Sequence, residues 1–171
     1  MPGVYRENSI GKNDAGISWC YRWRSPDLKS PVAMPSIPSS INGVAVDFAP
    51  AVNPSVDQRL VDALMQIVRP DIASGVVLER IYISSANDQH QLPSRHVQGG
   101  GKAVDISRIN SRKLALGYPS DPVLTAIVDA LQQAFELAPH RRENFGSAMK
   151  KKLGADYSVP GHTDHMHFSV N

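Results

Sequence analysis

Cysteine is nearly absent from this chain, which has only Cys20 among its 171 residues. A single thiol excludes an intramolecular disulfide framework and any zinc site built from several cysteines, and we expect Cys20 to be a small buried hydrophobic residue. Apolar runs of about eighteen residues are also missing, so no membrane-inserted helix is expected. Because the first residues lack the apolar segment of a secretory signal, we expect a protein made in the cytoplasm without a signal peptide.

An excess of charge of one sign is missing too. Eighteen Lys and Arg residues face sixteen Asp and Glu residues, which gives a net charge of +2, and aromatic residues make up only 6%. This composition argues against a nucleic-acid partner, because such binders usually carry a clear basic patch. A hydrophobic content of 42% and a length of 171 residues are typical of one folded domain, and we expect residues 1–171 to form a monomer.

Proline and apolar periodicity divide the chain. Six of the thirteen prolines lie between Pro26 and Pro54, so residues 1 to about 54 are expected to be irregular. Apolar residues at helical spacing predict a helix over 56–68, with Ser55 and Gln58 as a capping box. A second helix is predicted to begin at Asp121, with Pro122 in its first turn.

Short alternating or β-branched segments predict strands at about 76–84, at 102–107 and in the terminal DHMHFSV, while the basic stretch 140–162 is expected to be a loop. This order of elements predicts an α+β fold, a small single domain with a mainly antiparallel sheet flanked by helices.

The richest chemistry lies in two strings, SRHVQGGGKAVDIS at 94–107 and DHMHF at 164–168. Asp105 is central in a predicted strand, and His165 and His167 would share one face of the terminal strand. If these two strands pair, His96, Asp105 and His167 converge as the ligand set of a catalytic zinc site with one open position. The other histidines, His90, His140 and His162, are expected to be ordinary surface or core residues. The similar string GVAVD, ending at Asp47, lacks an upstream histidine and is interpreted as a decoy.

These strings resemble the zinc peptidases of peptidoglycan that include D-alanyl-D-alanine carboxypeptidases, L-alanyl-D-glutamate endopeptidases of phage endolysins, and murein endopeptidases. That family shares a pattern close to SxHxxGxAxD, followed by D/ExxH or HxH. The resemblance implies a small α+β fold around an antiparallel sheet, Zn²⁺ held by His96, Asp105 and His167, and bacterial peptidoglycan as the partner and substrate. With no signal peptide, the resemblance favours an enzyme for cell lysis that is delivered by a holin or by a secretion machine.

Two features depart from the family pattern. Nine positions separate His96 from Asp105 where the family has seven, and the glycines at 99–101 form the added loop, which glycine absorbs without strain. The upstream family arginine is also missing, because the matching string reads SSAND at 84–88. Arg80 and Arg95 are the candidates to replace it.

The roles of the remaining site residues follow from their positions in the motif. Asp164, three residues before His167, is favoured as the general base, with His165 steadying the developing oxyanion or binding substrate. Simple strand alternation places Asp164 on the opposite face, unless a bulge turns it back. Ser94 and Arg95 are assigned to loop support and substrate binding. Two alternatives stay open: a zinc-containing binding module without catalysis, and a different metallohydrolase such as a nuclease. Endopeptidase and carboxypeptidase activity are both compatible with the motifs.

Overall fold

The computed structural model of the chain describes residues 34–88, 90, 92–97 and 100–171. Cys20 and most of the proline-rich segment lie outside these residues. Within the described part of the chain, no helix has the length and apolar character needed to cross a membrane.

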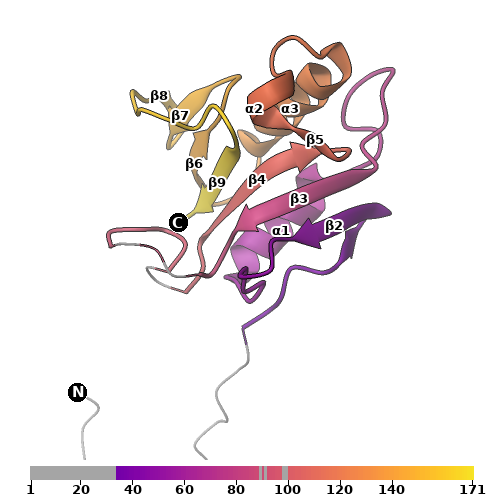
Figure 1. Ribbon diagram of the computed structural model, residues 1–171. Coiled ribbons are helices and arrows are strands. Elements are labelled where there is room, and N and C mark those ends of the chain that lie inside the picture. Colours follow the sequence, from indigo (N-terminus) through magenta and orange to yellow (C-terminus); the bar gives the residue numbers. More distant parts are fainter. Residues whose placement is uncertain (1–33, 89, 91, 98–99) are drawn as a thin grey trace, which may run out of the picture. The chain divides into compact units, whose positions relative to one another are not determined.

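The described residues form one open, mostly antiparallel sheet with a few helices, which confirms the α+β class (Figure 1). The strand order is β1-β2-β3-β4-β9-β6-β7-β8, with β5 paired to β4 at the side, and β2 and β3 run parallel. The strands are β1 (Ser40–Ile41), β2 (Val44–Phe48), β3 (Arg80–Ser85), β4 (Ala103–Ile109), β5 (Arg112–Lys113), β6 (Arg141–Phe145), β7 (Lys150–Lys152), β8 (Ala155–Asp156) and β9 (Met166–Val170).

Three helices accompany the sheet, α1 (Gln58–Ile67), the short α2 (Leu114–Gly117) and α3 (Pro122–Phe135). The helices α1 and α3 contact each other and both contact β9, and Figure 1 shows them on the same side of the sheet. They cover one face of the central strands.

Strand alternation sorts the residues of β9 between the two faces. Met166, Phe168 and Val170 join the buried core beneath the helices, and the ring of Phe168 stacks on Phe135 of α3 with centroids 4.4 Å apart. Burying each such side chain contributes about 1.5–3 kcal/mol. His167 lies between these core residues along the strand and therefore faces the other side of the sheet.

The residues that cap the helices agree only partly with those predicted from the sequence. Asp121 caps α3 as predicted, because its side chain accepts hydrogen bonds from the backbone N–H groups of Val123 and Leu124. The predicted capping box of α1 is wrong. The residue that caps α1 is Asp57, and the side chain of Gln58 donates to Asp62 instead.

Two stretches expected to be irregular contain strands. Residues 40–48 form β1 and β2, and the stretch 140–162 contains β6, β7 and β8. The strand β7 is the lysine run Lys150–Lys152, which lacks any apolar alternation and is extended because it pairs with β6 and β8. Its first lysine makes contacts within the fold. Lys150 donates hydrogen bonds to the carbonyls of Val159 and Gly161 and so holds the loop that leads into β9.

Candidate metal centre

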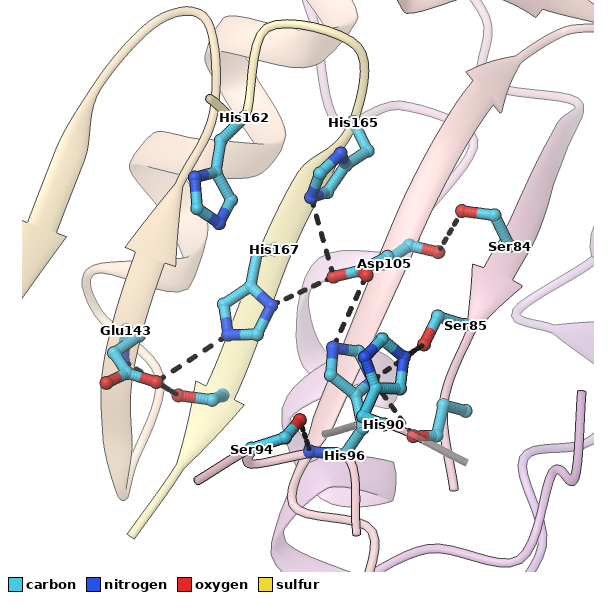
Figure 2. Close-up of polar contacts among 12 residues, drawn as sticks. Ser84, Ser85, His90, Ser94, His96, Asp105, Glu143, His162, His165 and His167 are labelled. Carbon is cyan, nitrogen blue, oxygen red and sulfur yellow. Dashed lines mark hydrogen bonds and ion pairs between the residues drawn. The ribbon is translucent and has the colours of Figure 1, made fainter. Parts of the chain in front are cut away.

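The three predicted ligands come together on the polar face of the sheet. The strands β4 and β9 pair with Asp105 directly opposite His167, and the loop before β4 brings His96 to the same carboxylate (Figure 2). Nδ1 of His167 lies 2.8 Å from Oδ1 of Asp105, and Nε2 of His96 lies 3.3 Å from Oδ2. One nitrogen or oxygen from each residue lies within 4.8 Å of the others, so the three side chains can hold a metal ion. The two strands do pair, which was the condition for the three side chains to converge.

The glycine run lets the loop return from His96 to β4. Gly100 and Gly101 have φ angles of 87° and 65°, which side-chain-bearing residues rarely adopt. A Cβ atom on Gly101 would lie only 2.8 Å from Cβ of Asn87. Glycine is therefore required at Gly101 on both grounds.

The buried ring of His96 is oriented for metal binding. Its Nδ1 lies 2.9 Å from the carbonyl oxygen of Ala86 and 2.9 Å from Oγ of Ser85. Because a carbonyl only accepts hydrogen bonds, Nδ1 carries the proton and Nε2 presents its lone pair toward Asp105. A carbonyl behind the ligand nitrogen is the usual outer partner of a metal-binding histidine.

His167 lies between two carboxylates. Its Nδ1 faces Asp105, and its Nε2 lies 3.6 Å from Oε2 of Glu143, a buried residue of β6. Burial alone would lower the pKa of His167, but the two carboxylates outweigh it and raise the pKa to about 9. Burial likewise opposes ionisation of Asp105, yet the hydrogen bond from His167 and the nearby ring of His96 hold its pKa well below the usual range. The two carboxylates therefore favour the protonated form of the His167 ring.

A second group of possible ligands, Asp88, His90 and His96, shares one residue with the first. His90 is exposed and its ring stacks on that of His96, with centroids 4.4 Å apart. Asp88 and His90 lie on the Nδ1 side of His96, because all three side chains contact Oγ of Ser85, and Nδ1 is the nitrogen that donates to the carbonyl of Ala86. The orientation of His96 thus favours the group with Asp105 and His167.

His165 and Asp164 form a pair beside the three ligands. Nε2 of His165 lies 3.9 Å from Oδ1 of Asp105, and its Nδ1 lies 2.8 Å from Oδ1 of Asp164. Asp164 is on the outer side of this ring, with 68% of its side chain exposed. Among the described residues, no hydrogen bond or ion pair links Asp164 to the three ligands. The imidazole, rather than the carboxylate, faces the candidate metal position.

Three residues near the site were not assigned to it by sequence reasoning, which expected His162 to be an ordinary surface or core residue. Ser85 and Glu143 contact the outer nitrogens of His96 and His167, and the ring of His162 lies 5.0 Å from that of His165 and 5.7 Å from that of His167. His162 reaches this place through a turn with positive φ angles at Gly161 (72°) and His162 (60°). The density of histidines near the end of the chain was the available signal for His162.

The loop residues Ser94 and Arg95 support the fold locally. Oγ of Ser94 accepts a hydrogen bond from the backbone of His96 at 3.3 Å, and the guanidinium of Arg95 donates to the carbonyl of Val170. Their assignment to substrate binding stays a prediction. Arg80 pairs with Asp47 at 2.6 Å, at the opposite end of β3 from Ser85, so neither the arginine nor the decoy aspartate belongs to the site.

Comparisons of this chain with protein-family models, with curated proteins and with solved structures found no match.

Proposed function

We propose that this chain is a zinc-dependent peptidase that hydrolyses a peptide bond of bacterial peptidoglycan, in a stem peptide or a cross-bridge. The observation that carries the proposal is the convergence of His96, Asp105 and His167 around one position, with a further imidazole beside them. The choice of peptidoglycan as substrate, and of lysis as the purpose, rests on the resemblance of the two motifs alone.

The donor set supports zinc over other common ions. Two imidazole nitrogens and one carboxylate match catalytic zinc sites, whereas Ca²⁺ and Mg²⁺ prefer oxygen ligands. When bound, zinc supplies Lewis-acid activation of water and of the scissile carbonyl. Three protein ligands leave room for these groups, and the outer contacts of His96 and His167 fit ligands that must stay fixed.

His165 is the group best suited to move protons. In its neutral form its Nδ1–H donates to Asp164, which leaves the Nε2 lone pair beside Asp105 and close to the reacting groups. Nε2 can accept the proton of the attacking water and return it to the leaving amine. Asp164 then acts through His165, by holding its ring and stabilising the imidazolium. This division of roles competes with the sequence-based assignment of Asp164 as the direct base, which stays a prediction.

His162 is suited to bind substrate. Its Nδ1 lies 3.1 Å from the carbonyl oxygen of Pro160 and therefore carries the ring proton, so Nε2 is a hydrogen-bond acceptor. Burial lowers the pKa of His162, which keeps the ring neutral near pH 7. An amide N–H of a bound peptide is a matching donor.

The test is the release of soluble muropeptides from purified peptidoglycan, followed by mass spectrometry. We expect release that stops with a chelator and returns with zinc, and the masses identify the bond. His165→Asn should abolish release while zinc stays bound, and Asp164→Asn should reduce it less. His140→Asn is the matched control, because His140 is exposed, lies outside the site, and has a positive φ that asparagine tolerates.

Zinc binding without any release of muropeptides would contradict the peptidase proposal and favour the non-catalytic binding module. If Asp164→Asn abolished release and His165→Asn did not, the direct base would be Asp164.

A further inference from the structure

Glu143 is a buried carboxylate held from several sides. It lies on β6 opposite Ser169 of β9, and Phe145 of the same strand lies opposite His167, so Glu143 is the diagonal neighbour of His167 (Figure 2). Oγ of Ser169 donates to Oε2 of Glu143 at 2.8 Å, and Nζ of Lys152 lies 3.1 Å from Oε1. The oxygen that Ser169 fixes is the one that faces Nε2 of His167 at 3.6 Å.

A buried charge is costly unless partners compensate it. Nζ of Lys152 and Oγ of Ser169 each contact one oxygen of Glu143, and these contacts compensate its buried charge. The lysine and the serine thus maintain a negative charge at a fixed position behind His167.

The position of this charge matters because Asp105 competes for the ring proton of His167. In the neutral ring only one nitrogen carries hydrogen, and a proton on Nδ1 would bond to Asp105 at 2.8 Å. That tautomer has no lone pair on the side of His96 and Asp105, and it cannot ligate an ion there. A carboxylate behind Nε2 favours the other tautomer.

We propose that Glu143 is a positioning residue of the metal centre, which keeps the proton of His167 on Nε2 so that Nδ1 is free to bind the ion. The inference rests on the metal-binding part of the proposed function and is independent of the substrate. Ser169 and Lys152 act through Glu143 by fixing its carboxylate.

The experiment measures the zinc dissociation constant of the metal-free full chain by competition with a chromophoric chelator. Glu143→Gln should weaken zinc binding by about 10–100-fold, the usual effect of losing such an outer partner. Glu136→Gln is the matched control, since Glu136 is a half-buried carboxylate that pairs with Arg141 at 3.2 Å and accepts from Asn144 at 2.8 Å, without touching the ligands. Its zinc affinity should equal that of the wild type.

A second readout separates positioning from a general loss of structure. At saturating zinc, long-range ¹H–¹⁵N spectra should show coordination of the wild-type His167 ring through Nδ1, and Glu143→Gln should lose this single pattern. Ser169→Ala, which frees the carboxylate but keeps its charge, should weaken zinc binding by a smaller factor. That variant carries the test if Glu143→Gln fails to fold.

Wild-type zinc affinity in both Glu143→Gln and Ser169→Ala would overturn the inference and leave the peptidase proposal intact. If the wild type binds zinc but cleaves no peptidoglycan, the peptidase proposal fails and the role of Glu143 stands. If the wild type binds no zinc, both are overturned.

Discussion

The two faces of the β4–β9 pair have opposite chemistry, although alternate residues of the same strands build both. Toward the helices the pair presents Val104, Ile106 and Phe168, all fully buried in the core. Toward the other side it presents Asp105 and His167, which face each other across the pair. The apolar face therefore fixes the strand register, and the register in turn places the candidate ligands. Changes on the two faces should separate stability from metal binding.

The largest expected effect is a loss of stability when the apolar face is changed. Phe168→Ala removes a buried ring that stacks on Phe135, and we expect the free energy of unfolding to fall by about 3–5 kcal/mol. Urea unfolding of the metal-free protein measures it. While the variant remains folded, its zinc affinity should be close to that of the wild type. A loss below about 1 kcal/mol would mean that this face does not carry the packing described here.

A change on the polar face is expected to lower stability less but to abolish metal binding. His96→Ala should remove stoichiometric zinc binding and lower the stability of the metal-free protein less than Phe168→Ala does. Zinc at a hundred times its dissociation constant should stabilise the wild type by about 2.7 kcal/mol and leave this variant unchanged. Unfolding curves with zinc and with a chelator check this. Full zinc stabilisation of His96→Ala would remove His96 from the ligand set.

The smallest expected effect concerns the pH dependence of stability, to which only the polar one of the two faces should contribute. Glu143 has a lowered pKa, so its contribution is present above about pH 4.5 and is lost as the pH falls toward about 2. His167 has a raised pKa, so its contribution is present below about pH 6.5 and is lost as the pH rises through about 9.

Urea unfolding with chelator across this pH range measures how the free energy of unfolding changes with pH on the acid side and on the basic side. Phe168→Ala should lower the free energy of unfolding equally at every pH. Glu143→Gln should instead weaken the dependence of that free energy on pH on the acid side. An acid slope unchanged in Glu143→Gln would contradict the ionised state described for this carboxylate.

The sequence predicted what depends on local pattern. Alternation in 102–107 and in the terminal segment predicted the two strands that carry Asp105 and His167, and Asp121 with Pro122 predicted the start of α3. These features depend on residues close together in the chain, where side-chain period and capping chemistry act directly.

The sequence did not predict what depends on distant pairing. The strands β6 and β7 read RRENF and KKK, and only their neighbours in the sheet make them extended. Glu143 meets His167 through the β6–β9 register, which no spacing in the sequence encodes. His162 reaches the site through a left-handed turn, and Asp164 lies outside His165 because β9 begins only at Met166.

The most direct test of the central claim is anomalous diffraction at the zinc edge from crystals of the zinc-loaded protein. We expect one strong peak about 2.0–2.2 Å from Nε2 of His96, a carboxylate oxygen of Asp105 and Nδ1 of His167. The absence of a peak there, or a peak only at Asp88 and His90, would contradict the proposed metal centre.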